Sequence, residues 1–114
     1  MRYLQECLYF LLWLISLYFD NIKTIENYAF YNCQNIEKLT IGESINTIGG
    51  TAFSACFGLK EVFIKATTPP SVTIDEGQST FFKNCVIYVP RESLKAYSED
   101  MYWGYYTNYV GYDF

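Results

Sequence analysis

Apolar residues recur along the chain in a unit that occurs twice, at 22–44 and 45–67. When one copy is laid over the other, eight apolar framework positions coincide, six of them identical and two conservative. The shared pattern is I-x-x-I-x-x-x-A-F-x-x-C-x-x-(I/L)-x-x-(L/V)-x-I, and most intervening positions are polar. One such unit cannot bury its own apolar side chains, so we expect successive units to stack around a shared core.

The alternating apolar residues at the end of each unit predict a short strand whose every second side chain is directed into the core. The stretch 29–33 predicts a short helix or turn that crosses that core. Stacking places neighbouring strands in parallel, about 4.8 Å apart. In that register Glu37 meets Lys60 and Lys38 meets Glu61, both in pairs of opposite sign. The predicted strands are 38–41, 61–64 and, further along, 86–89.

The regular period breaks after the second unit. Two consecutive prolines cannot continue a strand ladder, and the polar stretch Ser71–Thr80 is predicted to be an insertion. The phrase Phe-x-x-Cys then returns at Phe82 and Cys85, further along the chain than the regular period would place it. We therefore expect a degenerate third unit at 68–89, which completes a repeat region spanning 21–89.

Residues 90–114 are expected to close the stack as a C-terminal cap. The segment ends with seven aromatic residues in thirteen positions. We expect their rings to cover the open end of the core while the tyrosine hydroxyls stay in water. A short helix over 93–100 is predicted, with Ser93 as its N-cap. The face of this helix expected to pack inward carries Leu94, Tyr97 and Met101.

Residues 1–20 leave three interpretations open. The run from Cys7 to Phe19 is apolar except for Ser16, but it is shorter than the roughly 20 residues of a membrane span. It has the position and apolar core of a signal peptide but lacks a small-residue cleavage site. It is also compatible with a degenerate first repeat or N-terminal cap, or with a fragment whose true start lies upstream. The repeat interpretation rests on three apolar matches at one constant spacing, slightly shorter than the unit: Leu14 with Ile36, Leu17 with Leu39, and Phe19 with Ile41.

Composition narrows the possible functions. The 114 residues are 51% hydrophobic, which suits one small folded domain. The net charge of −4 and the lack of a basic run argue against nucleic acid as a partner. The chain contains no histidine, which removes the commonest general base and metal ligand. We therefore expect no enzyme activity, no metal site and no cofactor.

The four cysteines, Cys7, Cys33, Cys56 and Cys85, allow a disulfide interpretation. The repeat favours a different one, because Cys33 and Cys56 hold the same repeat position and Cys85 follows Phe82 at the same spacing. We expect these three to form an inward ladder of buried free thiols. Disulfide bonding and metal binding remain the alternatives.

The phrase Ala-Phe-x-x-Cys-x-x-(Ile/Leu)-x-x-(Leu/Val)-x-Ile resembles the BspA-like leucine-rich repeats of bacterial surface proteins. The closing stretch 85–97, followed by Tyr102 and Trp103, is similar to the way such arrays end in Bacteroides-type proteins. The resemblance implies a leucine-rich-repeat fold with no shared catalytic residues. It also implies an adhesin-type protein at the cell surface, with a host matrix protein as one possible partner.

These observations predict an α/β fold, namely a short leucine-rich-repeat solenoid with a small parallel sheet, short helical turns and an aromatic C-terminal cap. The candidate binding residues are Thr40, Phe63 and Tyr88, which point outward from successive strands. The expected function is non-catalytic protein binding at a cell surface, and membrane association requires residues 1–20 to be a leader or anchor. If residues 1–20 are a repeat, a cytoplasmic location becomes the expectation. The alternative function is a structural end fragment of a longer array with no ligand of its own.

Overall fold

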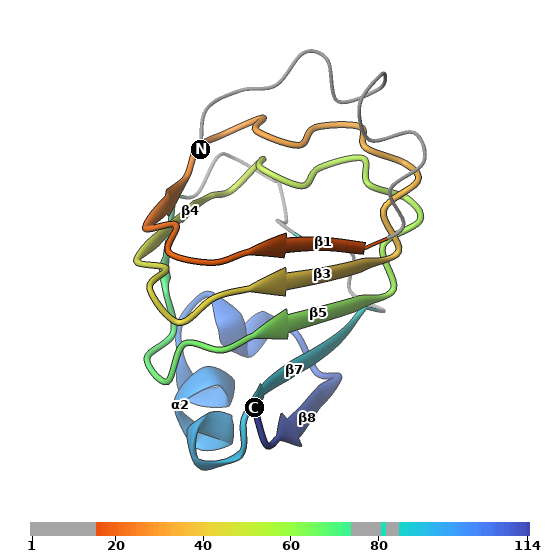
Figure 1. Ribbon diagram of the computed structural model, residues 1–114. Helices are drawn as coiled ribbons and strands as arrows, with labels where there is room; N and C mark the ends of the chain where they lie inside the picture. The colour runs from red at the N-terminus through yellow and green to blue at the C-terminus, as the bar shows by residue number, and fades with distance from the viewer. Residues whose placement is uncertain (1–15, 74–80, 82–84) are drawn as a thin grey trace.

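The computed structural model describes residues 16–73, 81 and 85–114, and its main feature is a five-stranded parallel sheet (Figure 1). The predicted strands 38–41 and 61–64 are confirmed, and the third continues by one residue to Pro90. The strands at the two edges were not predicted. In spatial order the sheet comprises β1 (Ser16–Phe19), β3 (Lys38–Ile41), β5 (Glu61–Ile64), β7 (Val86–Pro90) and β8 (Tyr109–Tyr112).

The register of this sheet follows the period of the sequence. Leu39 pairs with Val62, its equivalent in the next unit, and Leu17 pairs with Leu39, as the shorter spacing before the first unit predicts. Val62 pairs with Ile87, so the offset between paired residues is wider in the third unit. The inward residues of β3, β5 and β7 have no exposed surface: Leu39, Ile41, Val62, Ile64, Ile87 and Val89.

A second parallel sheet of three short strands lies beside the first, with β4 at the left of Figure 1. Ile48 of the middle strand pairs with Val72, which packs against the core. The interpretation of Ser71–Thr80 as an insertion is therefore wrong for its first three residues, and its other residues lie outside the described ones. The strands are β2 (Thr24–Ile25), β4 (Thr47–Gly49) and β6 (Ser71–Thr73).

Turns, and not a helix, form the stretch 29–33. Their amides bond to the next unit: the Phe30 N–H donates to the Ala52 carbonyl and the Asn32 N–H to the Ser54 carbonyl, both at 2.9 Å. Asn32 and its repeat equivalent Ala55 share a left-handed backbone, with φ of 64° and 62°. Because these amides bond between units, the turns join successive units as the strands do.

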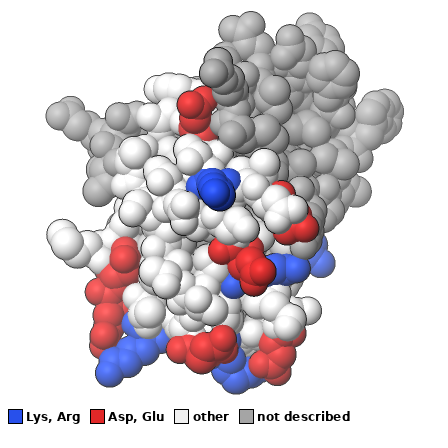
Figure 2. Space-filling model, turned by 60° about the vertical axis from the view of Figure 1, so that its left-hand side comes forward, with Lys and Arg blue, Asp and Glu red and all other residues white. Residues whose placement is uncertain are grey.

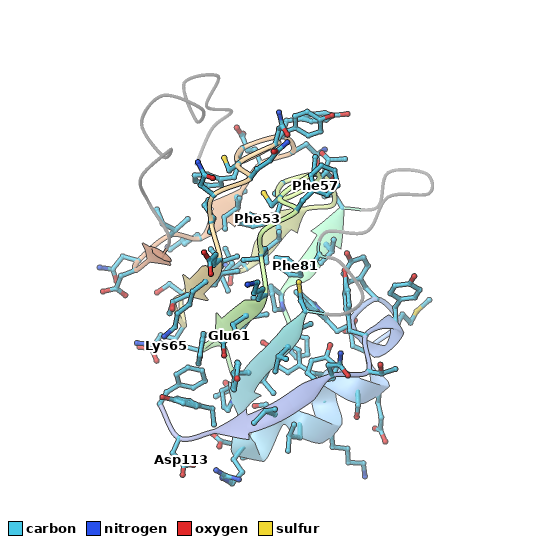
Figure 3. The ribbon with its side chains drawn as sticks, turned by 90° about the vertical axis from the view of Figure 1, so that its right-hand side faces the viewer. Phe53, Phe57, Glu61, Lys65, Phe81 and Asp113 are labelled. Atoms are coloured by element: carbon cyan, nitrogen blue, oxygen red, sulfur yellow. The ribbon has the colours of Figure 1, made fainter. Side chains whose placement is uncertain are left out.

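Phenylalanine rings stack through the core along the axis of the repeats. Phe53 lies between Phe30 and Phe81, with ring centroids 5.5 Å away on each side. Phe53 and Phe81 therefore lie inside the molecule in Figure 3. The sequence alignment matched Phe82 to Phe53, but Phe81 continues the stack, and Phe82 lies outside the described residues.

The cysteines of the three units are buried as expected. The Cys56 thiol donates to the Phe30 carbonyl at 3.1 Å, and the Cys85 thiol donates to the Leu59 carbonyl at 3.2 Å. The prediction of free thiols is confirmed for Cys56 and Cys85. It is wrong for Cys33, which is disulfide-bonded to a partner outside the described residues. The fourth cysteine, Cys7, lies outside the described residues.

The Cys56 thiol makes the stability sensitive to alkaline pH. Burial raises its pKa from the ordinary value of 9.0 to about 11. Below pH 9 the thiol is protonated in both the folded and the unfolded chain, so its contribution to stability is complete. Above pH 9 only the unfolded chain releases the proton, and stability falls by about 1.4 kcal/mol per pH unit until the folded thiol also titrates.

We therefore expect urea denaturation to give a lower free energy of unfolding at about pH 10 than at about pH 8, with roughly 1.4 kcal/mol of the loss due to Cys56. The remainder comes from buried phenols such as Tyr97 and Tyr106, whose pKa burial also raises. Cys56→Ala should show a smaller loss over the same interval, because it lacks the titrating group. Equal losses in both proteins would contradict this assignment.

The chain after β7 folds against the last unit. The 3₁₀ turn η1 (Arg91–Ser93) leads into α2 (Leu94–Glu99), so the predicted helix is confirmed with slightly tighter bounds. Ser93 does not cap it through its side chain, because its hydroxyl donates to the Thr67 carbonyl at 2.8 Å. Met101 does not join the inward face but is fully exposed, because the helix ends before the extended residue Asp100.

Three rings of this segment are buried against the end of the second unit and the third unit. Trp103, in the 3₁₀ turn η2 (Trp103–Tyr105), donates its indole N–H to the Pro70 carbonyl at 2.8 Å. Tyr97 donates its hydroxyl to the Ala66 carbonyl at 2.8 Å, and Tyr106 donates to the Phe81 carbonyl at 3.3 Å. Burial raises the pKa of both phenols. The expectation of water-exposed hydroxyls is wrong for Tyr106, because the Phe81 carbonyl accepts its hydrogen bond in place of water. Tyr97 lies on the inward face of the helix, as predicted.

Candidate binding face

The outer face of the five-stranded sheet carries the three residues that the sequence singled out. Thr40 pairs with Phe63, and Phe63 pairs with Tyr88, so their side chains form one row across β3, β5 and β7. Val110 of β8 extends the row beyond Tyr88. The structure therefore brings Thr40, Phe63 and Tyr88 together as the repeat register predicts.

Four rings form a cluster on this face, which we call the outer aromatic cluster: Phe63, Tyr88, Tyr112 and Phe114. Phe63 stacks on Tyr88 with centroids 4.2 Å apart and planes 5° apart. The rings of Tyr112 and Phe114 meet Phe63 edge-on, at 5.4 and 6.5 Å. They leave Phe63 only 9% exposed, whereas Tyr112 is 40% and Phe114 49% exposed.

Phe63 therefore points outward as predicted, but the end of the same chain covers it. The accessible rings are Tyr112 and Phe114, which were not predicted on this face. The available signal was the density of aromatic residues after residue 101. Those rings were expected to cover the core, whereas the structure places part of them over the opposite side of the sheet.

Charged groups surround the outer aromatic cluster. The Lys38 ammonium lies 4.9 Å from the centroid of Phe63, within cation–π range. The Tyr88 hydroxyl donates to the Glu61 carboxylate at 2.7 Å, and this hydrogen bond raises the pKa of Tyr88. Lys38 and Glu61 are register partners as predicted, yet each engages a ring of the cluster.

The other predicted charge pair, Glu37 with Lys60, is confirmed at 3.9 Å. Both side chains are at least half exposed, so the pair supports the register and contributes well under about 1 kcal/mol. On the face shown in Figure 2, acidic and basic side chains are interspersed among neutral ones. The described part of that face therefore has no extended area of one sign.

Two adjoining hollows flank residues 112–114. The smaller, of about 310 Å³, is lined by residues of β3 and β5 and by residues 112–114, which we call the tail. The lining residues from the strands and their ends are Lys38, Thr40, Phe63 and Lys65. The larger, of about 550 Å³, lies toward the ends of the strands, and four of its nine lining residues are acidic. Lys65 and Asp113, which border both hollows, lie on the same side of the molecule in Figure 3.

The outer face of the sheet is better suited to binding another molecule than to catalysing a reaction. Within the described residues, no group of three or more cysteine or carboxylate side chains is placed to hold a metal ion. No helix in the described part of the chain is both long and apolar enough to cross a lipid bilayer. The face instead offers accessible aromatic rings, which are enriched in contact surfaces between proteins.

Stacked parallel strands that recur at the period of the sequence, with an inward row of apolar side chains, define a leucine-rich-repeat protein. A family model described as "BspA type Leucine rich repeat region (6 copies)" matches residues 5–87. The chain belongs to this family of BspA-type leucine-rich repeats. Such repeats generally serve as non-enzymatic modules of protein interaction. No curated protein matches the chain.

Proposed function

We propose that the chain is a non-catalytic module that binds a protein partner through the outer face of its five-stranded sheet. The observation that carries this proposal is the outer aromatic cluster, in which two half-exposed rings, Tyr112 and Phe114, lie beside Lys38 and Lys65. Partly exposed aromatic rings on a rigid sheet are typical anchors of protein interfaces, because they bury much area at little entropic cost. Thr40 and Tyr88 supply the neighbouring polar contacts, and Phe63 supports the rings from below.

The proposed architecture is a short solenoid whose repeats occupy 21–89 and whose residues 90–114 form an aromatic cap. Buried Trp103 and Tyr106, both in contact with Phe81, support the cap. Residues 1–20 are proposed to include a degenerate repeat. The register of β1 and the start of the family match at residue 5 support that assignment.

The proposed location is the cell surface, where the module acts as an adhesin on a host matrix protein. The support is family membership, since BspA-type repeats are typically found in surface proteins. A membrane attachment is proposed only in the case that residues 1–20 act as a leader or anchor.

The test is binding of the purified protein to immobilised, solubilised extracellular matrix, measured by biolayer interferometry. We expect Tyr112→Ser together with Phe114→Ser to weaken binding about ten-fold or more, because loss of central aromatic anchors costs on the order of 1–2 kcal/mol. Phe57→Ser is the matched control, because this ring is 66% exposed and lies far from Lys65 and Asp113 in Figure 3. No binding by the unaltered protein would refute the matrix target, and equal loss in the control would refute the face.

A second function is favoured by the same C-terminal segment. Its buried rings close one end of the core, so the chain is alternatively the end piece of a longer array with no ligand of its own. In that case the unaltered protein should bind no partner, and Tyr112→Ser with Phe114→Ser should change nothing in the binding assay. Replacement of Trp103 should instead cause aggregation, because it opens the end of the core.

A further inference from the structure

The two hollows beside residues 112–114 differ in charge. Two lysines and one aspartate border the smaller hollow, and the aspartate, Asp113, is already paired with Arg91 at 3.1 Å. The larger hollow shares Asp113 and Lys65 with the smaller one and adds three further carboxylates, those of Asp20, Glu43 and Glu92. The tail that separates them presents the rings of Tyr112 and Phe114 to both sides.

The smaller hollow suits an acidic side chain. Lys38 rises from the start of β3, and its ammonium is held over the Phe63 ring, which shields part of it from water. Lys65 follows the end of β5 and lines the same hollow. A carboxylate between these two ammonium groups would gain attraction from both, and an apolar neighbour in the same ligand would contact Phe114.

The larger hollow suits a basic side chain and repels an acidic one. Its carboxylates come from separate parts of the fold: Asp20 follows β1, Glu43 follows β3, and Glu92 lies in η1. The rings of Tyr112 and Phe114 form part of the wall. A guanidinium or ammonium group placed there would gain both ionic attraction and cation–π contact.

We infer that this face recognises an extended protein segment that carries an acidic residue and a basic residue on either side of an apolar one. The two hollows adjoin on either side of residues 112–114, so the acidic and the basic residue should lie close in sequence, on either side of the apolar one. The charge order fixes the direction in which the segment lies across the tail. This inference rests on the proposed function, because it names the partner chemistry of the same face.

The test uses a displayed library of random peptides as the ligand, selected on the full-length protein and sequenced after each round. Parallel selections use the double variant Lys38→Gln with Lys65→Gln and, as a control for loss of a lysine charge, Lys95→Gln. Lys95 is exposed on α2 and borders neither hollow. We expect peptides enriched on the unaltered protein to carry an acidic and a basic residue on either side of an apolar one. Their enrichment should fall at least ten-fold on the double variant and stay unchanged on Lys95→Gln.

The outcomes distinguish failure of the inferred charge pattern from failure of the proposed binding function. Enriched peptides that depend on Tyr112 and Phe114 but not on the two lysines would overturn the inference and leave the proposed function standing. Peptides indifferent to both sets of variants, or no enrichment, would overturn both. Concentration-dependent dimerisation abolished by the double variant would assign the face to a second copy of the chain and refute the peptide ligand.

Discussion

Replacing Trp103 with alanine is expected to lower the free energy of unfolding by about 3–5 kcal/mol, the range for a fully buried tryptophan. Trp103 has no exposed surface, and its ring lies 5.4 to 6.0 Å from those of Tyr97, Tyr102 and Phe81. The change opens a cavity at the end of the core. It also leaves the Pro70 carbonyl without the indole donor now 2.8 Å away. Domains of this size have only about 5–15 kcal/mol of stability in total.

Urea denaturation of Trp103→Ala and Trp103→Phe separates the cost of the cavity from the cost of the lost hydrogen bond. The phenylalanine variant keeps most of the buried area but loses the hydrogen bond, so we expect a smaller loss of about 1–3 kcal/mol. Met101→Ala is the control, because the Met101 side chain is fully exposed only two residues earlier. A loss below about 1 kcal/mol in Trp103→Ala would show that the segment is a dispensable appendage.

Replacing Phe53 with alanine is expected to have a similar effect, again about 3–5 kcal/mol. Its ring is 2% exposed and is the middle one of three, so the change removes both stacking contacts, to Phe30 and to Phe81. The loss combines the transfer free energy of the ring with a cavity that rigid turns on both sides cannot fill.

The chain provides a close control for this experiment in Phe57→Ala. The two substitutions are chemically identical and close in sequence, but Phe57 is 66% exposed. Thermal and urea denaturation should show a change within about 1 kcal/mol for Phe57→Ala. Comparable losses in both variants would mean that the ring stack is not a principal source of stability.

The sequence predicted the features that depend on the period. Leu39, Val62 and their inward neighbours alternate with outward positions, and a strand can satisfy that alternation in only one register. The row of Thr40, Phe63 and Tyr88 follows from the same register. The three-stranded sheet was not predicted, because its strands contain only two or three residues and show too little alternation to be recognised.

The cover over Phe63 could not be predicted, because it depends on the path of the chain after α2. Whether Tyr112 lies over the core or over the outer face depends on β8 adding to the sheet beside β7, a contact between segments that share no repeat pattern. The disulfide at Cys33 was only an alternative in the prediction, for a related reason. The repeat makes Cys33 and Cys56 equivalent in position, but it does not show what lies near one of them and not the other.

The offset between paired residues of β3 and β5 equals the length of the repeated unit. An in-frame duplication of one whole unit at the boundary between Ser44 and Ile45 would therefore give a new unit the same neighbours on both sides. Recombination between the repeated segments of such a gene can therefore lengthen the array without requiring any new kind of contact between units. The loss or gain of a single codon within a strand has the opposite effect, because it turns the residues beyond it from core to solvent. Selection is therefore expected to tolerate changes in the number of units far more readily than changes in the length of one.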